Sequence, residues 1–217
     1  MQHVVLINPN TNAVTTSRMV EIAREAAGPG VSIAGLTARS GVPLIFTAEQ
    51  LDVARHAVLA LRAEIPVTCA GIIIAAFGDP ALDEIRGLLP VPVTGIGEAG
   101  LLEAAQGGRR FAVVSTSPGL VAATDAKVAR LGLGVTYAGT VLTPEEPVTL
   151  TADPSRLEAS LAAAIERAIV DHGVEAVVIG GGPLAAAARA LAPRFAIAVV
   201  EPVSAAVRAL LPKLSAR

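Results

Sequence analysis

Three short segments of this chain carry polar or glycine-rich residues of the kind that bind a small molecule. Residues 8–11 (NPNT) offer amides and a hydroxyl, residues 115–118 (STSP) offer hydroxyls ahead of an expected helix, and residues 180–183 (GGGP) form a turn whose N–H groups suit an anion. Each also has a plainer explanation, because Asn, Ser and Thr cap helices and glycines permit tight turns. We expect Asn8, Asn10 and Thr11 to bind a polar substrate group, and both interpretations stay open for the other two segments.

A fourth segment, residues 72–80 (IIIAAFGDP), predicts a buried strand that breaks into a turn. The strand ends on two alanines, whose methyl groups can neither carry a proton nor attack a carbon. Three carboxylates follow strands of this kind: Asp79 here, Glu98 after a Gly-Ile-Gly segment, and Glu201 at the last strand. A buried carboxylate with a raised pKa can act as a base. Alternatively, Asp79 caps a helix, Glu98 lies in a first turn and Glu201 holds a loop.

The remaining reactive side chains favour neither metal nor thiol chemistry. His3, His56 and His172 fall outside the expected strand-end loops, so we assign them surface or structural roles. The chain has no His-Glu-x-x-His motif and no Cys/His cluster, and we expect no metal site and no cofactor. Its single cysteine, Cys69, opens a strand at the end opposite the loops, which predicts an inert buried thiol.

The composition predicts a folded protein and gives no reason to expect polyanions as partners. The 217 residues are 53% hydrophobic and 17% charged, with a mean hydropathy of +0.61 and a formal charge of −2, which excludes disorder. The charge and the scarcity of aromatic residues argue against nucleic acid and anionic membranes as partners. The longest apolar stretch is about half of the ~20 residues that a membrane helix needs. Without a basic N-terminal region or a disulfide pair, we expect a cytoplasmic location.

Strand-like and helix-like segments alternate along the whole chain, which predicts parallel sheets flanked by helices. The expected strands are residues 3–7, 31–37, 70–77, 91–96, 110–115, 134–142, 176–182 and 197–202. The expected helices are residues 13–27, 49–65, 80–89, 118–132, 155–173, 183–192 and 204–211.

The second half of this pattern repeats the first, which indicates an internal duplication. The loop at residue 8 precedes the loop at 76 by nearly the same interval as the loop at 115 precedes that at 181. Gly107-Gly108 marks the break, so we predict one subdomain from residues 1–106 plus 204–217 and another from residues 107–203. Ligands bind beyond the carboxyl ends of parallel strands, so the four loops are expected to surround one cleft.

Four motifs, taken together and in order, resemble those of the hydantoin/allantoin racemases of the aspartate/glutamate racemase superfamily. They are INPNTN, AFGDPALDEIR, PVTGIGEAG and VEPVSAAVRAL, and they span nearly the whole chain. The resemblance implies two pseudo-symmetric, flavodoxin-like α/β subdomains with the active site between them. It also implies a cofactor-independent isomerase that acts on a small carboxylate or a hydantoin-like ureide. Members of this family tend to oligomerise, and an Ala-rich helical surface could pack against a second copy, so we expect a homo-oligomer.

The resemblance also implies a pair of cysteines, one on each side of the substrate's acidic carbon, that remove and return a proton. By motif they correspond to Ala76 and Gly181, so neither is a cysteine in this chain. Related arylmalonate decarboxylases keep only the second of the two, which this chain also lacks. The residues expected to surround the substrate are Asn8, Asn10, Thr11, Ser40, Phe77, Gly78, Ser115, Thr116, Ser117, Gly182 and Glu201.

Three functions remain open at this stage. The first is a racemase-like enzyme in which another base, such as Asp79, replaces the thiols. The second is a lyase or hydrolase that stabilises an enolate or oxyanion with hydroxyl and N–H groups. The third is a homologue that binds its ligand without turnover. Alanine at position 76 is also what an engineered knock-out would carry, although Gly181 fits that explanation less well.

Overall fold

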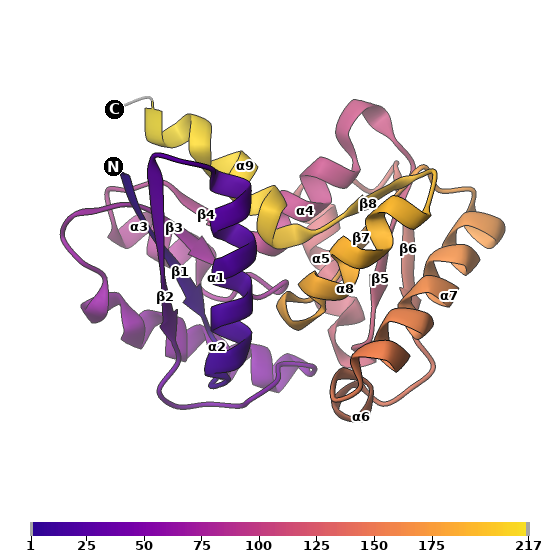
Figure 1. Ribbon diagram of the computed structural model, residues 1–217, viewed down its shortest axis with the longest axis horizontal. Helices are drawn as coiled ribbons and strands as arrows, with labels where there is room; N and C mark the ends of the chain where they lie inside the picture. Colours follow the sequence, from indigo (N-terminus) through magenta and orange to yellow (C-terminus); the bar gives the residue numbers. More distant parts are fainter. Residues whose placement is uncertain (1, 216–217) are drawn as a thin grey trace.

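The computed structural model describes residues 2–215 and contains two four-stranded parallel sheets of like topology (Figure 1). The first sheet has the order β2-β1-β3-β4 and the second the order β6-β5-β7-β8. The first sheet consists of β1 (Gln2–Asn8), β2 (Val31–Thr37), β3 (Cys69–Ile74) and β4 (Val93–Gly95). The second consists of β5 (Phe111–Ser115), β6 (Tyr137–Leu142), β7 (Ala176–Ile179) and β8 (Ala198–Val200). The predicted α/β fold with two pseudo-symmetric halves is confirmed.

Helices cover the sheets, and several of them begin at residues suited to capping. Asn12 accepts a hydrogen bond from the Thr15 N–H at the start of α1, and Thr47 and Gln50 form a capping box at the start of α2. The helices are α1 (Ala13–Ala27), α2 (Ala48–Leu61), α3 (Leu82–Leu88), α4 (Ile96–Ala104), α5 (Val121–Arg130), α6 (Pro147–Thr151), α7 (Pro154–His172), α8 (Ala185–Leu191) and α9 (Pro202–Ser215).

Two of these helices were not predicted, and one is longer than predicted. Helix α4 was not predicted because its sequence is nearly all apolar and includes Gly97 and Gly100, which disfavour helices. Helix α6 lies in a segment that Pro144 and Pro147 mark as a loop, but Glu146 caps it and Pro147 occupies a first-turn position. Helix α9 begins at Pro202 rather than residue 204 and continues to Ser215.

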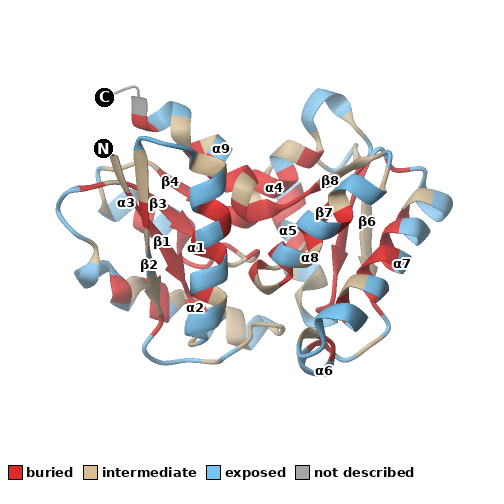
Figure 2. Cartoon of the chain, viewed as in Figure 1, coloured by how far each residue is buried: buried red, intermediate tan, exposed pale blue. Residues whose placement is uncertain are grey.

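The two central strands of each sheet are buried on both faces, as expected for parallel sheets between helices, whereas the edge strands β2 and β6 are mostly half-buried (Figure 2). Ile72, Ile73 and Ile74 of β3 are fully buried, and Val113 and Val178 are nearly so in the second sheet. This explains why these strands read as continuous apolar runs instead of alternating patterns.

The helices that follow the two fourth strands are exchanged between the halves (Figure 1). Helix α4 follows β4 of the first sheet but packs against β7 and β8 of the second. Helix α9 follows β8 of the second sheet but packs against α1, β3 and β4 of the first, and the two helices also contact each other. The predicted division of the chain places α4 in the first subdomain, whereas its contacts tie it to both sheets. One hydrophobic core therefore runs through both halves.

Candidate active site

A pocket of about 50 Å³ lies where the strand-end loops of the two halves meet. That volume is several times the roughly 10–15 Å³ that one water molecule needs. Nine of the residues expected at the site line it: Asn10, Ala76, Phe77, Gly78, Ser115, Thr116, Ser117, Gly181 and Gly182. The other lining residues are Leu44, Ile45, Ala75, Leu120, Thr124, Thr151, Gly180, Pro183 and Leu184.

The loop after β3 and the loop after β7 approach each other directly across this pocket. A Cβ atom placed on Gly180 would lie 3.4 Å from the Phe77 ring, and one on Gly182 would lie 3.2 Å from the Ala75 carbonyl oxygen. Glycine therefore allows the second loop to pack closely against the first. Both Ala76 and the glycine at 181 are partly accessible within this pocket.

In the amide-rich loop after β1, one asparagine supports the loop and another lines the pocket. Asn8 is fully buried and does not line the pocket; its Nδ2 donates to the Asn10 Oδ1 (2.9 Å), the Asn12 carbonyl (3.1 Å) and the Thr16 hydroxyl (2.9 Å). Asn10 does line the pocket, and its Oδ1 also accepts from the Asn12 N–H. Its Nδ2 has no partner within residues 2–215 and is available to a ligand. Asn8 thus orients Asn10. The same loop therefore caps α1 through Asn12 and presents Asn10 to a ligand.

The loop after β5 adds hydroxyl groups from the second half. The Ser115 hydroxyl donates to the Gly180 carbonyl (3.4 Å) and accepts from the Ser117 N–H (3.2 Å), so it joins this loop to the glycine loop. The Thr116 and Ser117 side chains are also buried, but their hydroxyls form no hydrogen bond with any described residue. Both hydroxyls are therefore free to bind a ligand.

Main-chain N–H groups complete a site made of hydrogen-bond donors. The N–H groups of Ala76, Phe77, Gly78 and Thr116 donate to no acceptor in the part of the chain that the structure describes, and all four residues line the pocket. Unpaired N–H donors beside a pocket require water or a ligand as their partner. No Asp, Glu, His, Lys or Cys is among the described lining residues. The site can therefore stabilise an anion, but it holds no side chain suited to accept a proton.

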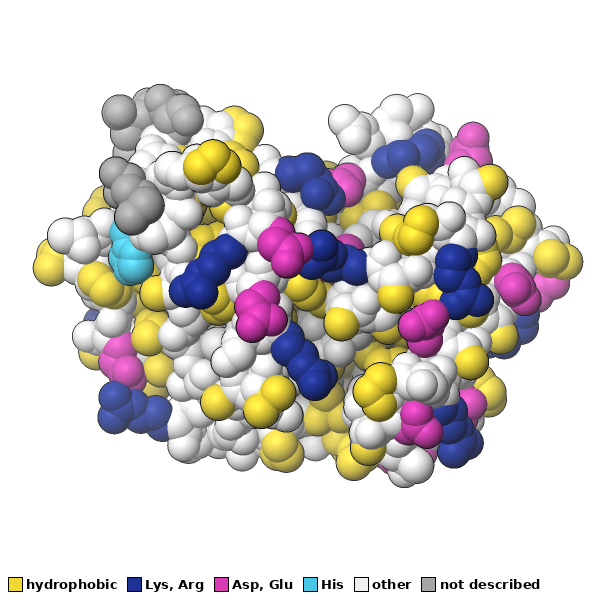
Figure 3. Space-filling model, viewed as in Figure 1, with side chains coloured by type: hydrophobic (Ala, Val, Ile, Leu, Met, Phe, Trp, Pro, Cys, Tyr) yellow, Lys and Arg dark blue, Asp and Glu magenta, His cyan; other side chains and the backbone are white. Residues whose placement is uncertain are grey.

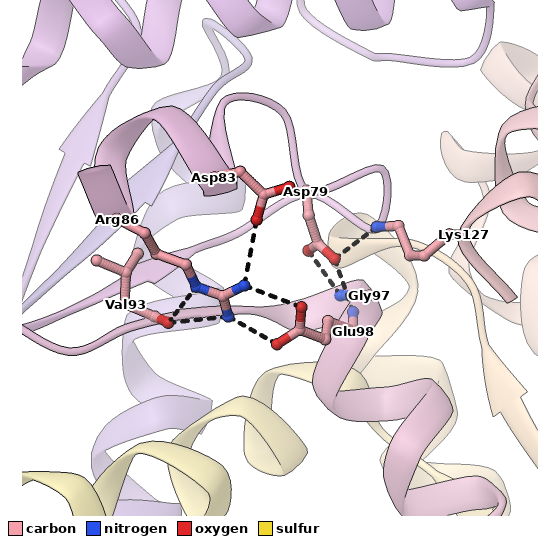
Figure 4. Close-up of polar contacts among 7 residues, drawn as sticks. All are labelled: Asp79, Asp83, Arg86, Val93, Gly97, Glu98 and Lys127. Atoms are coloured by element: carbon pink, nitrogen blue, oxygen red, sulfur yellow. Dashed lines mark hydrogen bonds and ion pairs between the residues drawn. The ribbon is translucent and has the colours of Figure 1, made fainter. Parts of the chain in front are cut away.

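Asp79 lies behind the pocket, where it fixes the loop (Figure 4). Its carboxylate accepts from the N–H groups of Gly97 (2.8 Å) and Glu98 (2.6 Å) at the start of α4, and from the Lys127 ammonium (2.5 Å). Lys127, from α5 of the second half, also donates to the Phe77 carbonyl (2.7 Å). Burial raises the pKa of Asp79 and lowers the pKa of Lys127, because each charged form loses water. Only donors face the Asp79 carboxylate, an arrangement that fits its ionised form.

Sequence reasoning missed Lys127 because it occupies an ordinary position in an amphipathic helix and belongs to no motif. In the structure its side chain is only 5% exposed and bridges the two halves. The loop that it holds has an unusual backbone, since Asp79 (φ 48°) and Ala81 (φ 59°) have left-handed conformations. Such conformations persist where surrounding contacts enforce them.

The other two candidate carboxylates are also engaged in structural contacts outside the pocket lining. Glu98 pairs with Arg86 (2.6 Å), and this bond lowers the pKa of Glu98. Glu201 caps α9 by accepting from the Val203 N–H (2.6 Å) and from the Ser204 N–H and hydroxyl (2.8 and 2.5 Å). Burial raises the pKa of Glu201. These contacts match the plainer interpretations, in which Glu98 belongs to a first turn and Glu201 holds a loop.

Several further expectations concern residues away from the pocket. Thr11 and Ser40 do not line it; the Thr11 N–H binds the Val42 carbonyl, and Ser40 is exposed. Cys69 is buried at the start of β3, where burial raises the pKa of its thiol. No cluster of three or more metal-ligating side chains occurs in residues 2–215. Nor is any helix among those residues both long and apolar enough to cross a membrane.

Two like parallel sheets with a ligand pocket between their strand-end loops define a two-lobed α/β enzyme of the racemase type. The family model for Asp/Glu/hydantoin racemases matches residues 4–210. The chain therefore belongs to the Asp/Glu/hydantoin racemase family, which are isomerases, and its predicted membership is confirmed.

Characterised relatives and solved structures agree with this assignment. The chain is 26% identical to a hydantoin racemase of Paenarthrobacter aurescens over 207 residues, which cover 94% of this chain and 88% of that protein. It superposes on an allantoin racemase from Klebsiella pneumoniae with a TM-score of 0.91, at 28% identity, covering 100% of this chain and 89% of the other. An allantoin racemase from Pseudomonas fluorescens gives a TM-score of 0.93 at 26% identity, covering 99% and 92%. The similarity thus extends over essentially the whole fold.

Proposed function

We propose that the pocket binds a small cyclic ureide or carboxylate with its acidic carbon between Ala76 and Gly181. We further propose that the protein promotes proton exchange at that carbon by stabilising the enolate, without a thiol base. The observation that carries this proposal is the set of unpaired donors at Ala76, Phe77, Gly78, Thr116 and Asn10. The relatives that racemise hydantoin and allantoin support a ureide as the substrate class.

The proposed chemistry uses solvent as the base. Hydroxide takes the proton from the acidic carbon and becomes water, and the electron pair moves onto the adjacent carbonyl as an enolate. The unpaired N–H and hydroxyl donors of the pocket lining stabilise the new negative charge. Water then returns a proton to either face of the carbon, which exchanges the hydrogen and scrambles the stereocentre. Without a positioned acid or base, this route is slower than the thiol-based one by about 10²–10⁴-fold.

A second candidate is binding without turnover. It is favoured by one specific observation, namely that no titratable side chain is among the described residues that line the pocket. In that case the donors would select a planar anion or ureide and hold it unchanged.

Proton NMR in D₂O separates these two candidates. The ligands are 5-substituted hydantoins, allantoin, aspartate, glutamate and arylmalonates, each followed for loss of its α-proton signal and for binding. We expect exchange above the buffer rate for a ureide, with a rate that rises with hydroxide concentration. Binding without exchange would select the second candidate, whereas neither binding nor exchange would refute both for these ligands.

A pair of matched variants locates the effect in the pocket. Ala76→Leu fills the space beside the acidic carbon and is expected to abolish both binding and exchange. Ala129→Leu adds the same atoms at an exposed position of α5 and is expected to change neither. Equal behaviour of the two variants would show that the ligand binds elsewhere.

A further inference from the structure

A second, larger cavity of about 380 Å³ adjoins the pocket on its outer side, and we name it the outer chamber. Leu44, Thr151, Gly182 and Pro183 line both spaces, so the two cavities are adjacent. The walls of the outer chamber come from both halves: α1, residues 42–50, the end of α6 and the start of α8. Nothing in the proposed proton exchange uses this space.

The lining of the outer chamber is apolar apart from a few polar groups and one charge. Met19, Ile22, Leu44 and Phe46 provide apolar surface, and Arg18 is the one charged residue among the described residues that line it. The Arg18 side chain is exposed and forms no hydrogen bond or ion pair within residues 2–215. A guanidinium beside a cavity with no anionic partner attracts a carboxylate, which it can bind through two parallel hydrogen bonds.

Neighbouring acids do not take up this positive charge. Glu21 and Glu25 lie with Arg18 and Arg189 around a separate, shallow hollow on the surface between α1 and α8. Glu25 pairs with Arg189 across that hollow (2.5 Å), and neither acid lies within 4.0 Å of the Arg18 guanidinium. Basic and acidic side chains alternate on this face of the molecule (Figure 3). Arg18 thus borders both this hollow and the outer chamber, and it forms no ion pair with the described acids.

We infer that the outer chamber is a subsite for an anionic substituent on the substrate's acidic carbon, with Arg18 as the residue that recognises its negative charge. This inference rests on the proposed function, which places the acidic carbon in the inner pocket. A short methylene linker would lie along Met19, Ile22 and Phe46, and its terminal carboxylate would meet the guanidinium at the outer wall. The substrate class is accordingly a cyclic ureide with a carboxyalkyl side chain.

Calorimetric binding of two ligands that differ only in charge tests this inference. They are 5-(2-carboxyethyl)hydantoin and its carboxamide, which have nearly the same shape. The wild-type protein is expected to bind the carboxylate roughly threefold to tenfold more tightly, with a preference that shrinks as salt is raised. Arg18→Met is expected to remove the preference and leave carboxamide binding unchanged. Arg62→Met removes an equally exposed arginine beyond the far end of α2 and should keep the preference.

The outcomes separate this inference from the proposed function. Equal binding of both ligands to the wild-type protein would overturn the role of the outer chamber and leave the inner pocket intact. A preference that survives in Arg18→Met would likewise overturn the role of Arg18. Failure of both ligands to bind would refute the proposed ureide pocket and the subsite together.

Discussion

The two loops that wall the pocket occupy equivalent places in the two halves but are held in different ways. Behind the loop after β3, Asp79 binds the start of α4 and the Lys127 ammonium of the opposite half. The loop after β7 contains no charged side chain. It is held by the bond from the Gly180 N–H to the Val114 carbonyl (2.8 Å), by the Ser115 hydroxyl on the Gly180 carbonyl (3.4 Å), and by close packing.

This difference explains how an uncharged pocket can lie directly in front of a buried ion pair. Lys127 binds both Asp79 and the Phe77 carbonyl, so it fixes the segment that lines the pocket and carries the unpaired N–H groups. The charges act on the loop's position and remain outside the pocket lining. Asp79 is therefore a positioning residue in this account. The second loop requires no such anchor, because its glycines lie directly against the first.

Removal of Lys127 should cause the largest loss of stability. Lys127→Met leaves the Asp79 carboxylate buried without its cation, and breaking a buried pair in this way costs about 3–5 kcal/mol of the free energy of unfolding. Urea denaturation measures the change. Lys127→Met combined with Asp79→Asn removes both charges and should recover a substantial part of the loss. A loss below about 1 kcal/mol in the single variant would show that the pair does not hold the loop.

Adding a methyl group to a glycine beside each loop should lower the free energy of unfolding by different amounts, and both losses should be smaller than or similar to that of the Lys127 variant. A Cβ atom on Gly97 would overlap the Phe77 carbonyl oxygen, so Gly97→Ala should cost about 3 kcal/mol of unfolding free energy. On Gly182 the nearest atom is the Met19 sulfur at 2.6 Å, the end of a flexible side chain, so Gly182→Ala should cost about 1 kcal/mol.

Gly87 provides the matched control for these two variants. It lies inside α3 with no atom within 4 Å of an added Cβ, so Gly87→Ala should be neutral or slightly stabilising. Thermal unfolding of the three variants gives the order directly. Equal costs at positions 97 and 182 would contradict the difference between the loops.

The pH dependence of stability should report the ion pair of Glu98, with the smallest expected effect. Arg86 lowers the pKa of Glu98 in the folded chain from the ordinary glutamate value of 4.5. The pair therefore stabilises the fold above that pH, and its contribution is lost as the pH falls below about 4.5 through the folded pKa. Glu98→Gln should remove about 1 kcal/mol at pH 7 and flatten the acid limb. Parallel acid limbs for this variant and the wild type would contradict the assignment.

The sequence predicted the fold well because parallel βα units carry strong periodic signals. The eight strands and the pairing of like halves followed from apolar runs such as Ile72–Ile74 and from the spacing of the loops. Helix α4 could not be predicted, because Gly97 and Gly100 serve contacts with other segments and weaken the local helical signal. In this segment, contacts with residues distant in the sequence stabilise the helix.

The sequence predicted those lining residues that reach the pocket simply because they follow the end of a strand. Asn10, Ala76, Ser115 and Gly181 line the pocket for that reason. The sequence did not predict the direction in which these side chains point. Asn8 turns into the protein, and Asp79 turns backward to the start of α4, because partners distant in sequence receive them. Lys127 and Arg18 belong to ordinary helical patterns, so only the three-dimensional arrangement singles them out.

We propose that this pocket has the geometry of a racemase site, with alanine and glycine at the two positions, 76 and 181, where the family resemblance implies cysteines. The direct test is Ala76→Cys with Gly181→Cys. Gly181 has a φ of 159°, a conformation that side chains rarely adopt, and a Cβ atom there would lie 3.2 Å from the Leu184 side chain. The change therefore strains the loop, and circular dichroism must first show that the double variant is folded. One thiolate removes the α-proton and the opposite thiol returns one, then a proton passes between them through solvent.

The measurement is racemisation of a 5-substituted hydantoin in D₂O, followed by optical rotation and by loss of the α-proton signal. We expect a rate at least about 10²-fold above that of the wild-type protein, rising with pH as thiolate forms, and little gain in either single variant. A folded double variant that binds the hydantoin but racemises it no faster than the wild-type protein would show that positions 76 and 181 do not flank the acidic carbon.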